Sequence, residues 1–258
     1  MRKDYLIERL EGFCPLDLQE DWDNCGFQVD TGKEQIHRVL VALEVTGDVI
    51  DEAIALNVDL IITHHPMLFS AIKKVKADDV IGGYICKLIQ NDISVYSCHT
   101  NFDKLDGGNN DYIGGLLELE DIRPFDLDNG FCRKGNTPFE VTFLEVVHKA
   151  AEAFRIEEKF FKTVGDLSKN IEIIGWCSGA GTEFLEAAKN EGCDLFITGD
   201  LKYHEAQMAK ELGLCVLDAG HYGSEKIFVE NMADMLRLEL RMADLEVLES
   251  VIDINPFK

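Results

Sequence analysis

Hydrophobic and polar positions along this chain follow two alternating periods. Short, nearly all-apolar runs predict buried strands at 39–43, 59–63, 93–98, 171–177, 194–198 and 214–217. Weaker strands are expected at 27–29 and 160–164. Apolar residues spaced along one helical face predict helices at 5–13, 48–56, 80–89, 111–117, 141–154, 182–191, 204–212 and about 224–238. Strands that alternate with helices of about ten residues predict an α/β fold.

The pattern also contains an internal repeat. Residues 58–63 match residues 193–198 after a shift of 135 positions, and the helical stretches before them match as well. A shift of 122 positions places His99-x3-Asp103 on His221-x3-Glu225. Any α/β protein repeats strand, turn and helix, but two matches in the same order favour a duplication. We therefore expect two similar α/β halves, 1–125 and 126–258, that meet near 126–130 and pack as one unit over 1–258.

Composition and charge narrow the possible partners. The 258 residues are 46% hydrophobic and 28% charged, as in ordinary folded proteins. The 48 acidic residues against 25 basic ones give a formal charge of −23, which disfavours direct nucleic acid binding. The start of the chain is amphipathic and charged, and no apolar run approaches the ~18 residues of a membrane span. A cytoplasmic protein without a membrane partner is expected.

Eight cysteines occur, and none form a Cys-x-x-Cys pair. Most lie in or beside apolar segments, which favours buried thiols over disulfides or a zinc knuckle.

Histidines follow the ends of several predicted strands. His64 and His65 follow the strand at 59–63, and His99, His204 and His221 follow later strands. In α/β proteins, ligand-binding and catalytic residues commonly follow the carboxyl ends of the strands. Imidazoles and carboxylates are also ligands that divalent transition metals prefer. A capping or core role remains the alternative for each. His37 and His148 belong to no such group.

The spacing of these residues bears on their roles. Neighbouring side chains on a strand point oppositely, but Pro66 forces His65 into an extended conformation at the strand end, so the two imidazoles could reach two ions. Asp103 would be a ligand, and His99 either a ligand or a residue that orients one. His221 and Glu225 share one helical face, which suits chelation or an exposed ion pair.

The loop at 177–182, Cys-Ser-Gly-Ala-Gly-Thr, lies between a predicted strand and a helix. Its backbone N–H groups could cradle a phosphate, but it lacks the lysine of a P-loop. A tight strand-to-helix turn is the favoured interpretation.

Seven stretches together resemble the Nif-three-like dinuclear metal proteins, often called GTP cyclohydrolase I type 2 homologues. They are 22–26, 42–46, 62–69, 99–103, 178–181, 198–204 and 220–225. The resemblance implies a two-metal centre with ligands His64, His65, Asp103, His221 and Glu225, in which Glu225 bridges the ions. It also implies a ring-shaped homohexamer with the metals facing an internal cavity.

Two positions depart from the family pattern. Glu44 stands where the family commonly has aspartate, and 108–111 reads Gly-Asn-Asn-Asp in place of Gly-Val-Asn-Asp. Neither is expected to touch the ligands. The roughly fifty residues between 119 and 171 indicate the short form, without an inserted domain.

The ligand set favours metal-assisted hydrolysis of a nucleotide-like, cyclic amide or phosphoester substrate. Two nearby ions can lower the pKa of a bound water and polarise a phosphoryl or amide oxygen, with His99 or His204 as general base or acid. Nitrogen and oxygen ligands suit Zn, Fe, Mn, Co or Ni. A non-enzymatic metal-handling or scaffold protein would need the same ligands, so it remains the alternative.

Overall fold

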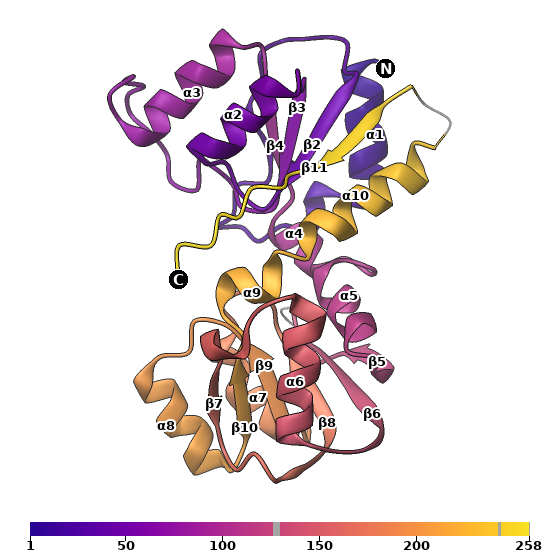
Figure 1. Cartoon of the computed structure of the whole chain (residues 1–258). Coiled ribbons are helices and arrows are strands. Elements are labelled where there is room, and N and C mark those ends of the chain that lie inside the picture. The colour runs from indigo at the N-terminus through magenta and orange to yellow at the C-terminus, as the bar shows by residue number, and fades with distance from the viewer. Residues whose placement is uncertain (126–129, 242–243, 258) are drawn as a thin grey trace. The chain divides into compact units, whose positions relative to one another are not determined.

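Two sheets organise the chain in the computed structural model, which describes residues 1–125, 130–241 and 244–257 (Figure 1). Unit 1 consists of Met1–Leu105 and Phe228–Lys258, and unit 2 of Asp106–Ile227. These bounds differ from the predicted halves, because the C-terminal segment returns to the sheet of the first half. The predicted junction at 126–130 falls mostly on residues 126–129, which lie outside the described residues.

The sheet of unit 1 has the strand order β1-β4-β3-β2-β11. Strands β2, β3, β4 and β11 are parallel neighbours, and β1 runs antiparallel to β4. The elements of this unit are α1 (Lys3–Phe13), a 3-10 turn (Leu16–Leu18), β1 (Gly26–Val29), β2 (Arg38–Ala42), α2 (Gly47–Ala55), β3 (Leu60–Thr63), α3 (Val80–Gln90), β4 (Ser94–Ser97), α4 (Thr100–Lys104), α10 (Phe228–Glu239) and β11 (Glu246–Glu249).

The sheet of unit 2 has the order β5-β6-β8-β9-β10-β7, with β8, β9 and β10 parallel and the other pairs antiparallel. Its elements are α5 (Asn109–Leu116), β5 (Glu120–Pro124), β6 (Arg133–Thr142), α6 (Phe143–Phe154), β7 (Lys162–Val164), β8 (Asn170–Trp176), α7 (Leu185–Asn190), β9 (Leu195–Thr198), α8 (Tyr203–Leu212), β10 (Cys215–Asp218) and α9 (His221–Glu225). Two 3-10 turns lie at Glu158–Phe160 and Thr182–Phe184.

The strand order confirms two similar halves. The order β1-β4-β3-β2 of unit 1 recurs as β7-β10-β9-β8 in unit 2. Val39 pairs with Leu60, and Ile174 pairs with Leu195, which reproduces the shift of 135 residues in both strands. A carboxylate that accepts two backbone N–H groups is repeated at the same shift. Asp59 Oδ2 accepts the N–H groups of His37 and Arg38, and Asp194 Oδ2 those of Glu172 and Ile173.

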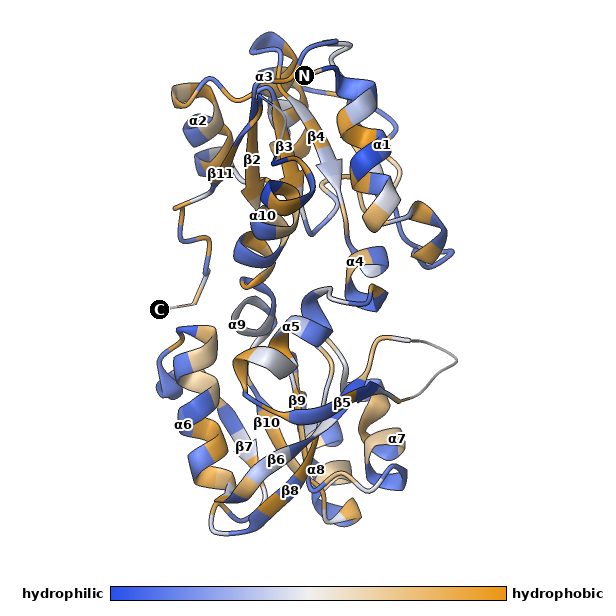
Figure 2. Cartoon of the chain, turned by 90° about the vertical axis from the view of Figure 1, so that its right-hand side faces the viewer, coloured by the Kyte–Doolittle hydropathy of each residue, from blue (hydrophilic) through white to orange (hydrophobic). Residues whose placement is uncertain are grey.

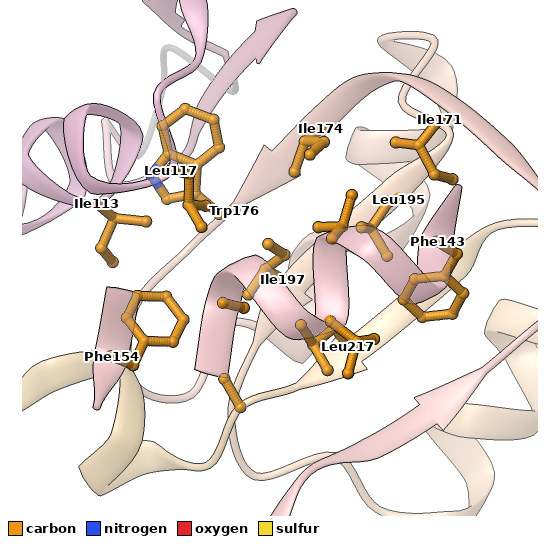
Figure 3. Packing of buried hydrophobic residues seen from close by; sticks show 14 of the residues in the cluster. Ile113, Leu117, Phe143, Phe154, Ile171, Ile174, Trp176, Leu195, Ile197 and Leu217 are labelled. Carbon is orange, nitrogen blue, oxygen red and sulfur yellow. The ribbon is translucent and has the colours of Figure 1, made fainter. Parts of the chain in front are cut away.

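The core strands are buried because their side chains are almost all apolar, as the colouring of β2 and β3 shows (Figure 2). In unit 2, helix α6 packs its apolar face on the sheet, and Phe143, Phe154 and Trp176 fill the space between them (Figure 3). The Trp176 indole N–H donates to the Asn110 carbonyl at 2.7 Å, which satisfies its polar atom in the interior. Burying each of the phenylalanine side chains contributes about 1.5–3 kcal/mol to the free energy of folding.

Several elements differ from the predicted ones. Strands β5, β6 and β11 were not predicted, because their residues are largely polar and half-buried or exposed. The single helix expected at about 224–238 is two helices, α9 and α10. Helix α6 begins at Phe143, after a capping box between Thr142 and Glu145. Within the described part of the chain, no helix is long and apolar enough to cross a membrane.

Candidate metal centre

The donors of unit 1 follow two neighbouring parallel strands. Thr63 at the end of β3 pairs with Ser97 at the end of β4, so the segments after these strands begin side by side. The N–H groups of His64 and His65 both donate to the Leu43 carbonyl, at 3.1 and 2.9 Å. This shared acceptor turns the chain out of the strand, and the centroids of the two adjacent imidazoles lie 5.1 Å apart.

Three imidazoles converge there. One donor atom from each of His64, His65 and His99 lies within 4.8 Å of the others. His64 is fully buried, and its Nδ1 lies 2.9 Å from the Cys98 carbonyl. A carbonyl only accepts, so Nδ1 carries the proton and Nε2 is left with its lone pair. That is the tautomer a metal ligand requires.

Asp103 completes this group. It lies on α4, is buried, and its Oδ1 is 3.5 Å from His64 Nε2. His99 precedes the helix, at its N-cap, so it does not share a helical face with Asp103. The carboxylate and the imidazole therefore act from different directions, unlike a chelating i, i+4 pair.

The orientation of His99 is set by Asp23, a residue to which the sequence pattern gave no role. The fully buried Asp23 carboxylate lies 2.9 Å from His99 Nδ1 and accepts both the N–H and the hydroxyl of Thr100. Burial raises the pKa of Asp23, but the hydrogen bonds from His99 and Thr100 outweigh burial and hold it well below its usual value. An ionised Asp23 keeps the proton of His99 on Nδ1 and leaves Nε2 as the acceptor. Asp23 and His99 are 76 residues apart, so no local spacing could reveal the pair.

Glu44 also reaches a donor. Its Oε2 lies 3.5 Å from His65 Nδ1. The expectation that this departure from the family pattern would not touch a ligand was therefore wrong. The longer side chain of glutamate, compared with aspartate, extends toward the ring.

Cys25 lies in the loop after Asp23 but is not a thiolate donor. Burial, together with the nearby Asp23 charge, raises the pKa of its thiol to about 12. Its Sγ donates toward Asp23 Oδ2 at 3.2 Å and toward Asn101 Oδ1 at 3.1 Å. The donor groups found among the described residues of unit 1 therefore offer nitrogen and oxygen.

Unit 2 carries a second donor pair on α9. His221 Nε2 lies 2.9 Å from Glu225 Oε2, which confirms the predicted i, i+4 geometry. His221 Nδ1 lies 2.9 Å from Asp200 Oδ2, so a carboxylate orients this ring from behind, as Asp23 does for His99. Glu225 is buried and Asp200 is exposed. Asp200 adopts a left-handed backbone with φ +57°.

The glycine-rich loop after β8 is a tight turn whose donors are already used. The N–H groups of Ser178, Gly179 and Gly181 donate to Asn110 Oδ1, Ser224 Oγ and Thr198 Oγ1 at 2.9, 3.0 and 2.8 Å. The turn interpretation is confirmed, because these three groups are not available to cradle a phosphate. Asn110, a position that agrees with the family pattern, therefore holds the loop that lies against Glu225.

His204 stands apart from these donors. It is the second residue of α8, is exposed, and its ring lies 5.3 Å from that of Tyr203. No donor group found among the described residues includes it. A catalytic role for His204 stays a prediction.

The two His-x3-carboxylate segments are not at equivalent positions. Cys98 N donates to the Thr63 carbonyl as Ala219 N donates to that of Thr198, so this part of the repeat is shifted by 121 residues. His99 then corresponds to Gly220, and the shift of 122 was wrong by one. This explains why His221 lies inside its helix while His99 precedes its own.

Comparisons with known proteins identify a family and a fold that this chain shares. The family model of Duf34/NIF3 (NGG1p interacting factor 3) matches residues 1–256. A Clostridium acetobutylicum protein named GTP cyclohydrolase 1 type 2 homolog is 35% identical over 261 residues, which cover 98% of this chain and 97% of that protein. Among solved structures, a Staphylococcus aureus hypothetical protein has a TM-score of 0.93 at 26% identity, covering 100% of this chain and 99% of that one. Reduced HcgD from Methanocaldococcus jannaschii has a TM-score of 0.83 at 32% identity, covering 98% of both chains.

Proposed function

This chain belongs to the Duf34/NIF3 family, and we propose that it binds two divalent metal ions and acts as a metal-dependent hydrolase. The observation that carries the proposal is the convergence of His64, His65 and His99 within 4.8 Å, with Asp103 beside them. Such crowded, largely buried imidazoles lose hydration, and a shared cation compensates for that loss.

The donor chemistry fits such ions. We propose that the ions would be held by five residues, His64, His65, Asp103, His221 and Glu225. Support comes from the position of these residues, which follow the carboxyl ends of parallel strands in each unit. The carbonyl and carboxylate that hold the Nδ1 atoms of His64 and His221 give both rings a defined orientation. Zn, Fe, Mn, Co and Ni all suit such nitrogen and oxygen ligands.

Bound ions would supply Lewis-acid polarisation of a substrate oxygen and a water of lowered pKa. The protein's own contribution is proton transfer and orientation. Asp23 fixes the proton of His99 on Nδ1, so His99 Nε2 can accept a proton from an attacking water. We take nucleotide-like, cyclic amide and phosphoester compounds as the substrate class, and a homohexamer as the assembly. Relatives carry the name GTP cyclohydrolase 1 type 2 homolog.

Metal analysis of purified protein tests the ligand set. Close to two ions per chain are expected, and Glu225→Gln should lose half or more of them, because a neutral amide binds a divalent cation more weakly than a carboxylate does. The matched control is His148→Ala, which removes an exposed pair with Glu158 at 2.6 Å, another histidine–glutamate contact in unit 2. A metal-free wild type, or equal loss in both variants, contradicts the proposal.

A turnover screen tests the activity. Nucleotides, phosphoesters and cyclic amides are incubated with stripped and reloaded protein, and product should form only after metal is restored. Bound metal without metal-dependent turnover of any substrate would favour metal handling or scaffolding instead.

A further inference from the structure

Two large aromatic side chains stand exposed beside the donors of unit 1. Trp22 and Phe69 are 57% and 55% exposed. Their ring centroids lie 6.0 Å apart at 55°, and they lie 6.2 and 6.5 Å from the centroid of His99. Because the rings are tilted, they do not stack on each other and remain free to contact a third ring. We refer to them as the Trp22–Phe69 platform.

Two side-chain amides hold the platform in place. Gln28 lies in β1 and is buried; its Oε1 accepts the Leu68 N–H at 3.0 Å, and its Nε2 donates to the Asn24 carbonyl at 2.6 Å. Asn24 Nδ2 in turn donates to the Leu68 carbonyl at 2.8 Å. The loops that carry Trp22 and Phe69 are therefore tied to each other. A ligand that binds here loses less free energy to ordering the site.

The chemistry around the platform selects its occupant. Large adjacent aromatic surfaces on a protein mark interaction sites. Here the two rings lie next to the His99 imidazole, which offers a polar group at the rim. An aliphatic ligand would use the apolar area but not this polar group. A planar heteroaromatic ring uses both, by stacking and by in-plane hydrogen bonds.

We propose that the Trp22–Phe69 platform binds the planar heteroaromatic ring of a small-molecule substrate and holds it beside His99. This inference rests on the proposed function and names the part of the substrate that the protein recognises. The formal charge of −23 disfavours a nucleic acid strand as the source of that ring.

Calorimetric titration tests the platform with three ring-bearing probes: GTP, flavin mononucleotide and neopterin. Tripolyphosphate, which has no ring, is the ligand control. Base stacking on an aromatic side chain is worth about 1–3 kcal/mol, so Trp22→Leu and Phe69→Leu should each weaken ring binding by about 5- to 150-fold. Trp22→Phe should retain most of the affinity. Tripolyphosphate should bind all variants equally.

The matched protein control is Phe139→Leu. Phe139 is 69% exposed in unit 2, where it lines an apolar pocket of about 170 Å³ with Leu117 and Val146. Ring binding should be unchanged in this variant. If Phe139→Leu weakens binding as much as Phe69→Leu, the ring binds elsewhere, and the proposal is overturned. It is also overturned if no probe binds.

Tryptophan fluorescence locates the bound ring. The chain has two tryptophans, and Trp176 is fully buried, so an added ring should quench Trp22. Unchanged emission at saturation overturns the proposal. A blue shift that grows with protein concentration, without any probe, would mean that another chain covers the platform, which also overturns it.

Metal analysis of the same variants separates the two proposals. Trp22→Leu and Phe69→Leu should keep the metal content of the wild type. If purified wild-type protein contains no metal but still binds a ring, the metal proposal is refuted and the platform is not. Normal metal content with unaltered ring affinity in both variants would refute the platform alone.

Discussion

Gly179→Ala should lower both the stability of unit 2 and the metal affinity that depends on the position of the Glu225 carboxylate. A Cβ at this position would lie 2.1 Å from Glu225 Oε1 and 3.0 Å from its Cδ, whereas ordinary contact begins at 3.4 Å. Gly179 is also held by Ser224 Oγ at its N–H. The added methyl therefore has to displace either the carboxylate or the loop, and both changes disturb the contact between Glu225 and His221.

Two free energies are involved. Gly179 has φ +63°, and an alanine in the left-handed region costs about 1–2 kcal/mol. For a chain of this size that lowers Tm by about 2–8 °C. Displacing a carboxylate that binds the ions, or one that supports a ligand, typically costs about 10- to 100-fold in metal affinity. The variant should therefore show both losses.

Gly192→Ala is the matched control. Gly192 has φ +80° in the same unit, and a Cβ there would meet nothing within 4 Å. It should lose a similar Tm but bind metal as the wild type does. The assay measures metal affinity by competition with a chromophoric chelator, and Tm by calorimetry of the stripped proteins. Equal metal affinity in the two variants would refute the assignment of Glu225 as a ligand.

Three further predictions follow from the same contacts. His204→Ala should keep the full metal content and change only turnover; metal loss equal to that of Glu225→Gln would make His204 a ligand. Tripolyphosphate should bind through the metals, so chelation of the metals should abolish its calorimetric signal, and undiminished binding would contradict this. Raising NaCl to 200 mM should weaken tripolyphosphate binding only slightly, because few lysine contacts are available to screen. Asp59→Asn should lower the free energy of unfolding at pH 7, because burial raises the pKa of Asp59 but Lys33 and the N–H groups of His37 and Arg38 outweigh it and lower the pKa. That stabilisation is present above the ordinary aspartate pKa of about 4 and is lost as pH falls through the lowered pKa of Asp59. In urea unfolding, the free energies of the wild type and the variant should therefore become equal in acid. A difference that stays constant with pH would argue against this role of Asp59.

Apolar periodicity was enough to predict the central strands and most helices. Strands such as β3 and β9 are four-residue apolar runs that can only be stable inside a sheet. Strands β5, β6 and β11 were missed because their stability comes from pairing with a neighbour and not from an apolar face. The division of the chain into two units at Leu105 and Phe228 could not be predicted from apolar periodicity either, because β11 pairs with β2 across roughly two hundred residues of sequence.

The site was predictable where its geometry is local. His221 and Glu225 contact each other because one helical turn separates them, and His64 and His65 share the end of one strand. The residues that hold these rings were missed. Asp23 reaches His99 from 76 residues away, and Asp200 reaches His221 from 21. A carboxylate in a loop has no periodicity, so only the folded chain reveals which ring it orients.

The duplication explains why the two units supply different donors. The shift of 135 residues places His64 on Gly199 and His65 on Asp200. At Gly199 a Cβ would lie 2.6 Å from both the Gly179 carbonyl and the His221 N–H, so no side chain fits where unit 1 has its buried imidazole. Unit 2 has filled that space with the glycine-rich loop, and that loop lies against Glu225. Asp200, which is at the position equivalent to His65, does not supply an imidazole and orients the His221 ring. The duplicated halves therefore carry different donors: three imidazoles in unit 1 and an oriented histidine–glutamate pair in unit 2.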